Sequence, residues 1–483
     1  MDKVEILEKE IAVGCRFHLT AGQQEAVSGI ARFLTMTDSR KAYVLCGYAG
    51  TGKTSLMSAL VRAMHILHRR VVLLAPTGRA AKVFSLYSGA AAYTIHRRIY
   101  RQRSLACDDV FSLDRNMYED TLFIVDEASM ISNEGLSGIS FGSGCLLDDL
   151  ISFVYSGKGC SLLLSGDTAQ LPPVGESLSP ALDMDFLRSY GLTVNGSILT
   201  DVVRQNDGSG ILYNATVLRN LLSPMNGRKS DGSFRPVTEC FEDVRKIRGD
   251  ELVGCLSDCY GRDGIGDTIV LCRSNKHTII YNRGIRSAIL DREDELCRGD
   301  RLMIVKNNYY WTDWMAQKMM ADGTTLDGIP QFIANGDMAE VRRVRHIREM
   351  YGFRFADAVL CFPDYDDCEL EVTVLLDTLH SESPSLTKEQ HETLFRNVME
   401  DYAYIGDRKE RMKKMREDPY YNALQVKYAY AVTCHKAQGG QWTNVFIDRG
   451  YVPDDIQGDD YYRWLYTALT RATGTVYLVN WPE

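Results

Sequence analysis

The segment GYAGTGKT, from Gly47 to Thr54, has the residue types and spacing of a loop that binds phosphate groups. It fits the pattern G-x-x-x-x-G-K-[ST] at every fixed position. In such a loop the glycines let backbone N–H groups turn toward phosphate oxygens, Lys53 neutralises the β and γ phosphates, and Thr54 offers its hydroxyl to Mg²⁺. We therefore expect ATP and Mg²⁺ here, with these nucleotide-binding residues: Gly47, Ala49, Gly50, Thr51, Gly52, Lys53, Thr54 and Ser55.

The segment LFIVDEASM carries two adjacent carboxylates, Asp126 and Glu127, after an apolar run. If that run is a strand of a parallel sheet, both carboxylates lie at the edge where the phosphate loop also lies. Asp126 is then placed to hold Mg²⁺, mainly through water, and Glu127 to orient the attacking water and take its proton. The pair favours hydrolysis over a small-molecule kinase, whose acceptor substrate is the nucleophile and which needs no second carboxylate.

The segment AVTCHKAQGGQW, residues 431–442, allows three chemical interpretations. Cys434 and His435 form a metal pair, or Cys434 is a thiol nucleophile, or the run is a turn that touches a ligand. Adjacent side chains of an extended strand point to opposite faces, which argues against the first two interpretations. We therefore expect Cys434 in the core and His435, Lys436 and Gln438 in a turn.

Composition places limits on the compartment and on the partners. Thirteen cysteines without a CxxC pair indicate reduced thiols in the cytoplasm. No apolar run approaches the ~20 residues that cross a bilayer, and the N-terminus has no apolar core of a signal peptide, so we expect neither export nor a membrane partner. The net charge of -9 argues against indiscriminate coating of nucleic acid, but the basic runs 96–103 and 341–348 leave room for local tracks for a polyanion.

The elements that must position these groups follow from short apolar runs bounded by Gly, Pro or Ser. Such runs, alternating with segments of helical period, are typical of buried parallel strands in an α/β sheet. We therefore predict one doubly wound domain over residues 1–200. Its expected strands are residues 42–46, 71–75, 121–125, 161–165 and 197–200.

A second set of runs falls into two blocks on either side of a different kind of sequence. The expected strands are residues 268–272, 428–433, 444–448 and 475–479. The intervening region has short alternating strands and then a charged helical stretch over residues 387–415. We predict a second α/β domain over 201–297 and 426–483, interrupted by a small β domain over 298–425.

Eight segments occur in the order of a known motif set: LTAGQQEAV, LLAPTGRAAK, TIHR, VDEASM, LSGDTAQLPPVG, LTDVVRQ, VTCHKAQG and LYTALTRAT. Together with the phosphate loop, they resemble superfamily 1 DNA helicases, and are most similar to the RecD-like and Dda-like group that moves 5′-to-3′. The resemblance spans residues 19–472. It implies two RecA-like P-loop NTPase domains with a small inserted SH3-like β accessory domain.

The resemblance also implies roles for single residues around the nucleotide. Gln23 would read the adenine, and Gln170 would contact the γ-phosphate and the attacking water. Arg204 and Arg471 would be arginine fingers that bridge the β and γ phosphates. With Lys53 and Glu127, these residues form the expected catalytic set.

For nucleic acid the resemblance implies contacts with phosphates and sugars, and hence little sequence preference. Each hydroxyl in this set has a plain structural alternative as a turn or cap residue. Gln441 and Trp442 depart from many relatives, which carry an acidic or hydroxyl residue there. The implied contacts are Thr77, Arg79, Thr94, His96, Ser274, Asn275, Thr433, His435 and Gln438.

The activity that the resemblance implies is an ATP-dependent DNA helicase, active as a monomer on single-stranded and forked duplex DNA, in DNA repair, recombination or replication. The alternative is a DNA-stimulated ATPase subunit or remodeller that translocates without unwinding. An insertion over 97–120 would be a small hairpin or wedge, in which Tyr100 and Phe111 either stack on bases or pack the insertion onto the domain. The β domain with its charged helices leaves room for a protein partner.

Overall fold

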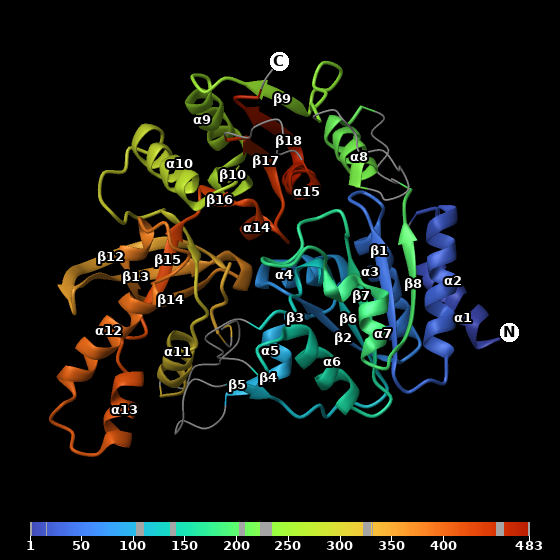
Figure 1. The fold of residues 1–483 in the computed structure, drawn as a ribbon, viewed down its shortest axis with the longest axis horizontal. Helices are drawn as coiled ribbons and strands as arrows, with labels where there is room; N and C mark the ends of the chain where they lie inside the picture. The colour runs from blue at the N-terminus through green and yellow to red at the C-terminus, as the bar shows by residue number, and fades with distance from the viewer. Residues whose placement is uncertain are drawn as a thin grey trace.

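A computed structural model shows the fold of the chain. The structure describes residues 2–15, 17–102, 111–135, 142–201, 208–222, 234–321, 330, 332–450 and 458–481. Two α/β units and one small β-barrel follow from the sheet topology (Figure 1). No helix in these ranges is both long and apolar enough to span a membrane.

The first sheet has six parallel strands in the order β3-β2-β6-β7-β1-β8. Alternate strand residues face opposite layers, so that Tyr43 packs on one side of the sheet and Val44 on the other. Helices α1 to α4 cover the first side and α5 to α7 the second. The strands are β1 (Lys41–Gly47), β2 (Arg70–Ala75), β3 (Ala92–Thr94), β6 (Thr121–Val125), β7 (Ser161–Gly166) and β8 (Thr193–Leu199).

The helices of this unit are amphipathic, and the helix after β1 is buried over most of its length by its neighbours. Short 3-10 turns follow β6 and β7. The helices are α1 (Lys3–Gly14), α2 (Ala21–Thr35), α3 (Lys53–Ile66), α4 (Gly78–Ser88), α5 (Ile95–Ile99), α6 (Leu146–Ser156) and α7 (Met184–Ser189), and the turns are η1 (Ala128–Met130) and η2 (Pro180–Leu182).

The second sheet has five parallel strands in the order β16-β10-β17-β18-β9. Its strands are β9 (Val244–Ile247), β10 (Thr268–Cys272), β16 (Ala431–Thr433), β17 (Trp442–Asp448) and β18 (Ala472–Val479). One side packs on α8 (Gly210–Leu222), α14 (Cys434–Ala437) and α15 (Asp459–Leu469), and the other on α9 (Leu252–Asp263) and α10 (Asn275–Ala288), which η4 (Ile265–Asp267) separates.

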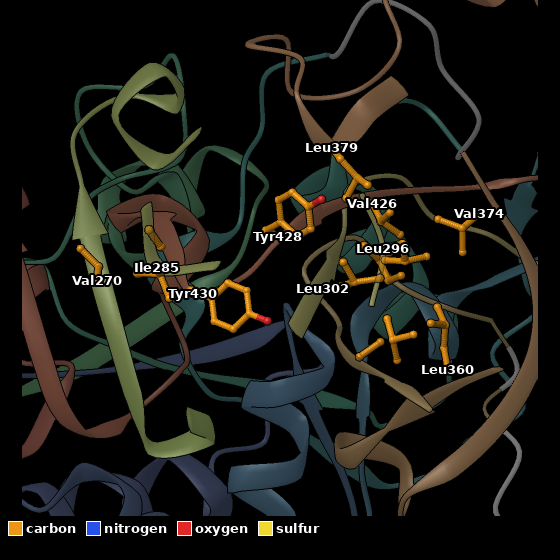
Figure 2. Packing of buried hydrophobic residues seen from close by; sticks show 14 of the residues in the cluster. Val270, Ile285, Leu296, Leu302, Leu360, Val374, Leu379, Val426, Tyr428 and Tyr430 are labelled. Atoms are coloured by element: carbon orange, nitrogen blue, oxygen red, sulfur yellow. The ribbon is translucent and has the colours of Figure 1, made fainter. Parts of the chain in front are cut away.

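The inserted unit is a closed barrel of β11 (Arg301–Ile304), β12 (Met338–Met350), β13 (Phe353–Phe362), β14 (Cys368–Leu375) and β15 (Leu424–Tyr428). Its core is continuous with one layer of the second sheet, as Figure 2 shows for Leu302 and Val426 beside Val270 and Tyr430. The other elements here are α11 (Tyr310–Ala321), η5 (Pro363–Tyr365), η6 (Leu376–Leu379), α12 (Lys388–Asp401) and α13 (Arg408–Arg416).

Two details differ from the expected elements of the inserted unit. The run 428–433, expected as one strand of the second sheet, is divided, because β15 ends in the barrel at Tyr428 and β16 starts at Ala431. The barrel thus extends past residue 425. The charged stretch 387–415 forms two helices, since α12 ends at Asp401 and α13 starts at Arg408.

The expected wedge contains a two-stranded hairpin of β4 (Tyr100–Gln102) and β5 (Phe111–Leu113). Tyr100 is buried, and its hydroxyl donates to Asp149 Oδ2 at 2.7 Å. Of the two expected roles for Tyr100, packing onto the domain is therefore confirmed and stacking on a base is wrong, because the ring is buried and the hydroxyl bonds α6. The side chain of Phe111 lies outside the described part of the chain.

Candidate functional site

The phosphate loop connects β1, which ends at Gly47, with α3, which begins at Lys53. Gly50 and Gly52 have φ angles of 77° and 82°, in the left-handed region that favours glycine. The Lys53 ammonium donates to the carbonyl oxygens of Gly47 at 2.6 Å and Tyr48 at 3.1 Å. The loop therefore curls around its own lysine. Thr54 and Ser55 lie in the first turn of α3.

The two predicted carboxylates follow β6 at the same sheet edge. Asp126 is buried, and its Oδ1 accepts from the Ser165 hydroxyl and the Glu127 N–H, both at 3.0 Å. Burial and then the charge of Glu127 raise the pKa of Asp126 to about 6, while Lys53 acts in the opposite direction. Glu127 has a φ of 52°, a left-handed conformation that is strained for a residue with a side chain. This conformation lies at the point where the chain passes from β6 into η1.

A third carboxylate, Asp167, was not singled out in the sequence. It follows β7, which pairs with β6, and it is fully buried. Burial raises the pKa of Asp167, while the nearby Lys53 and the Tyr466 hydroxyl oppose that rise. Asp167 could have been found from the apolar run 161–165 that precedes it. If that strand pairs in parallel with 121–125, its carboxyl end lies beside Asp126 and Glu127 at the same edge of the sheet.

Helix α15 of the second unit reaches directly into this site. The Tyr466 hydroxyl accepts from the Ala49 N–H of the phosphate loop at 2.8 Å and donates to Asp167 Oδ2 at 2.6 Å. The loop after β7 is held in the same way, since the Leu171 N–H donates to Thr467 Oγ1 at 2.9 Å and Arg463 donates to the Thr168 carbonyl. One helix therefore joins the phosphate loop to the loop after β7.

The predicted γ-phosphate contact, Gln170, lies in that loop. It is buried, and its side-chain oxygen has no hydrogen-bond partner within the described ranges. A cavity of about 310 Å³ beside it is lined by residues of both units, Tyr48 and Asp167 from the first and Arg219 and Arg463 from the second. The amide is thus placed at the junction of the two units.

Of the two predicted arginine fingers, only Arg471 lies among the described residues. Arg471 is buried and donates to the carbonyl oxygens of Thr467 at 3.2 Å and Gly440 at 3.3 Å, and to the Thr470 hydroxyl at 3.3 Å. Among the described residues it forms no ion pair with a carboxylate, so it is not a surface salt bridge. Arg204 lies outside the described residues.

Gln23 lies beside the phosphate loop, but its amide is already bonded. Its Nε2 donates to the Thr51 carbonyl at 3.0 Å, and its Oε1 accepts from the Thr20 N–H at 3.1 Å in a capping box that starts α2. The side chain is 1% exposed. In this arrangement Gln23 braces the phosphate loop, and reading of adenine would use the second N–H and the second oxygen lone pair of the amide.

Three of the hydroxyls expected to contact nucleic acid begin helices. Thr77, Thr94 and Ser274 accept from the N–H groups of Ala80 at 3.2 Å, Arg97 at 3.2 Å and His277 at 3.3 Å. They are therefore N-caps. Capping fixes where each hydroxyl lies, at the carboxyl end of β2, β3 or β10, and leaves its proton available to an acceptor.

Arg79 does not point freely outward, as a phosphate contact would. Its guanidinium lies over the Trp442 ring, 4.1 Å from the centroid, and donates to the Gln441 carbonyl at 2.9 Å. The pair joins α4 of the first unit to β17 of the second. This cation–π contact explains the aromatic residue at 442. The geometry favours a role for Arg79 in holding the two units together.

Five further residues were expected to contact nucleic acid: His96, Asn275, Thr433, His435 and Gln438. Gln438 is buried and donates from Nε2 to the Leu171 carbonyl at 2.8 Å, so it joins the second unit to the loop after β7. Asn275 donates to the Glu382 carbonyl at 3.1 Å.

The two histidines of this set differ in exposure. His435 is exposed. His96 packs on Tyr100 with 5.7 Å between the ring centroids, and burial lowers the pKa of His96 to about 4. Thr433 is half-buried at the start of α14.

The segment around Cys434 is helical, so the expected strand geometry is wrong there. Strand β16 ends at Thr433, and α14 covers Cys434–Ala437. Cys434 is buried, its thiol donates to the Trp464 carbonyl at 3.5 Å, and burial raises its pKa to about 12. The described residues hold no cluster of His, Cys, Asp and Glu suited to a metal ion. The thiol is a core residue, on a different side of the turn from His435.

The comparisons with known proteins cover both α/β units. Residues 18–220 match the family described as AAA domain, and residues 428–479 match the UvrD-like helicase C-terminal domain. The chain is 30% identical to the ATP-dependent RecD2 DNA helicase of Deinococcus radiodurans over 58% of its length and 36% of that protein. It is 25% identical to the ATP-dependent DNA helicase dda of phage T4 over 59% of its length and 61% of that protein. The chain therefore spans less than two thirds of either relative.

The matching solved structures include Bacteroides Pif1 bound to single-stranded DNA. It shares 15% sequence identity and a TM-score of 0.46, with 95% of this chain and 92% of that chain covered. The two parallel sheets and the phosphate loop define a P-loop protein with two RecA-like units. The match at residues 428–479 is to a helicase domain, and both relatives are ATP-dependent DNA helicases, so over part of its length the chain is similar to DNA helicases.

Proposed function

We propose that the chain is an ATP-dependent DNA helicase that moves 5′-to-3′ along single-stranded DNA and unwinds forked duplexes. The observation that carries this proposal is the contact of Tyr466, in the second unit, with both Ala49 and Asp167 of the first. A ligand at the phosphate loop acts directly on the contact between the units. Turnover there therefore changes how the units meet, which is what translocation requires.

The nucleotide site has the residues for hydrolysis. Mg²⁺ would be held by the Thr54 hydroxyl and by Asp126, mainly through water, and would supply neutralisation of phosphate charge. The buried carboxylate and the hydroxyl at the first turn of α3 suit a hard cation. Glu127 orients the water and takes its proton, and Gln170 contacts the γ-phosphate. Arg471 and Arg204 stabilise the charge that develops between the phosphates.

Three side chains carry the coupling between the units. Tyr466 bonds the phosphate loop, Gln438 bonds the loop after β7, and Arg79 packs on Trp442. Two of these, Gln438 and Arg79, were expected to contact nucleic acid directly. We propose instead that they transmit the state of the nucleotide to the track.

For the track we propose Thr77, Thr94, Ser274, Asn275, Thr433 and His435, at the carboxyl ends of strands of both sheets. These groups suit phosphates and sugars, so binding is sequence-tolerant. We also propose three domains, 1–200, 201–297 with 429–483, and 298–428; the boundary expected at residue 425 moves to Tyr428 because β15 belongs to the barrel.

The test uses the purified chain with matched duplexes that carry a 5′ tail or a 3′ tail. We expect ATP hydrolysis stimulated by single-stranded DNA and strand release from the 5′-tailed duplex alone. Stimulated hydrolysis without release from either duplex would favour the alternative, a DNA-stimulated ATPase subunit or remodeller. ATP turnover only in the presence of a small-molecule acceptor would identify a kinase.

A further inference from the structure

A small cavity lies where the second sheet meets the barrel. It has a volume of about 20 Å³, enough for one water molecule or one oxygen of a phosphate group. The N-terminal turns of α10 contribute Asn275 and Thr278, and the end of β16 contributes Thr433. Two lysines, Lys427 and Lys436, also line it. Among the described residues that line the cavity, none is acidic.

Lys427 is an unusual residue for a barrel strand. It lies in β15, is 9% exposed, and donates its ammonium to the Ser381 carbonyl. Burial and then the charge of Lys436 lower the pKa of Lys427 to about 8. Burying an ammonium costs free energy unless a compensating group is present. The carbonyl compensates only part of the charge.

Lys436 lies in α14, within the CHKA turn, and is half-buried. Burial lowers the pKa of Lys436 to about 8 as well. Two ammonium groups that converge on one cavity repel each other, and this repulsion is removed when an anion lies between them. The cavity mouth also offers the amide and hydroxyl groups of Asn275 and Thr433 as hydrogen-bonding partners.

From this convergence we propose that Lys427 and Lys436 clamp one backbone phosphate of single-stranded DNA at the junction of the second sheet and the barrel. The proposal rests on the proposed function and adds two residues and a location to the track. The cavity has room for one phosphate oxygen, and Lys427, Lys436 and Thr433 all line it. Because the ligands are charges and not base-edge readers, the clamp acts on any sequence.

The first test is binding of a fluorescent oligothymidine and a mixed-sequence strand, without nucleotide, over a series of salt concentrations. Lys436→Gln is expected to weaken both complexes equally and to reduce the salt slope by at most about 0.7, the value for one phosphate contact on a single strand, because Lys427 remains at the same phosphate. Lys436→Arg should restore the slope. Lys246→Gln, on β9 at the opposite edge of the sheet, is the matched control and should leave the slope unchanged.

Chemical acetylation followed by mass spectrometry tests Lys427 without a substitution that disturbs the barrel. In the free chain we expect Lys436 to react readily and the more buried Lys427 to react slowly; single-stranded DNA should protect both lysines and leave Lys246 unprotected. Protection by inorganic phosphate at constant ionic strength, with none from DNA, would identify a free-anion site and overturn the clamp. An unchanged salt slope for Lys436→Gln, in a chain that still unwinds DNA, would also overturn it and leave the proposed function standing. Failure of the unmodified chain to bind DNA would overturn both.

Discussion

The Tyr466 hydroxyl donates to Asp167 at 2.6 Å and accepts from the Ala49 N–H at 2.8 Å, so one phenol joins the two units at the phosphate loop. Tyr466→Phe removes both hydrogen bonds and keeps the ring. A hydrogen bond to a charged group contributes about 1.5–3 kcal/mol, which corresponds to roughly a 10- to 100-fold effect. We expect stimulation of ATP hydrolysis by single-stranded DNA to fall by about that factor, with basal hydrolysis much less affected. Steady-state ATPase assays with and without DNA measure both.

The control for this substitution is Tyr462→Phe, one turn earlier on the same helix. Tyr462 is also buried, so its substitution tests the general effect of losing a hydroxyl from α15. Equal DNA stimulation in Tyr466→Phe and the unmodified chain would contradict a coupling role for Tyr466.

Glu127→Gln should bind ATP and DNA but hydrolyse ATP very slowly. The substitution keeps the size of the side chain and removes the base, and general base catalysis is worth about 10²–10⁴ in rate. Single-turnover hydrolysis measures the loss, and filter binding measures retention of ATP. Glu134→Gln, at an exposed position after the same strand, should be near normal. A near-normal rate for Glu127→Gln would remove its assignment as the base.

Arg471→Lys and Arg471→Ala separate a catalytic guanidinium from a structural one. The guanidinium donates to the carbonyl oxygens of Thr467 and Gly440, and we expect its loss to reduce turnover about a thousandfold, as for other arginine fingers. DNA binding should be retained in both variants. Thermal unfolding is the second measurement, because a cooperative transition lost in both variants would indicate that Arg471 serves folding instead.

Because Arg79 stacks on Trp442, its loss should lower the stability of the chain. A contact of Arg79 with a phosphate would instead affect the salt dependence of DNA binding. Arg79→Gln should lower the free energy of unfolding by about 0.5–2 kcal/mol, the range for cation–π contacts. The salt slope of DNA binding should not change, since the guanidinium contacts the ring and a carbonyl. Trp442→Leu should show a larger loss of stability, because Trp442 is also buried in the core of the second unit. A salt slope reduced in Arg79→Gln and unchanged in Trp442→Leu would indicate that Arg79 contacts a DNA phosphate.

Asp337 predicts a pH dependence of stability. It is buried in the barrel, accepts from the Tyr365 hydroxyl and the Ala334 N–H, both at 2.7 Å, and burial raises its pKa to about 7. The folded state therefore binds more protons than the unfolded state between about pH 4 and 7, so this group lowers stability as pH rises through that window. Asp337→Asn should remove that share of the pH dependence in urea unfolding series. Parallel curves for the two chains would contradict the assignment.

The sequence predicted the parts of the molecule that depend on local pattern. Continuous apolar runs such as residues 121–125 and 161–165 became central strands, and the phosphate loop lies between a strand and a helix as its pattern requires. Asp167 was missed although its strand was predicted, because adjacency of β6 and β7 is a property of the sheet order. The helical turn at Cys434 was missed because four residues are too few to show a period.

The side-chain roles that differed depend on partners far away in the chain. Arg79 donates to a residue 362 positions later, and Gln438 to one 267 positions earlier. Residue type and local spacing contain no information about such partners. Thr77, Thr94 and Ser274 show the opposite case. Helix capping depends on residues close in sequence, so the sequence alone offered a cap as the structural alternative for each hydroxyl.

The passage from β15 to β16 has a mechanical consequence. Only Ala429 and Tyr430 separate a barrel strand from a strand of the second sheet, and the Tyr430 hydroxyl donates to the buried Asp300 at 2.8 Å at the barrel's first strand. The barrel and that sheet also share a core (Figure 2). We therefore expect the barrel to turn together with the second sheet, so that a small rotation of the sheet gives a larger displacement at the far ends of β12 and α12.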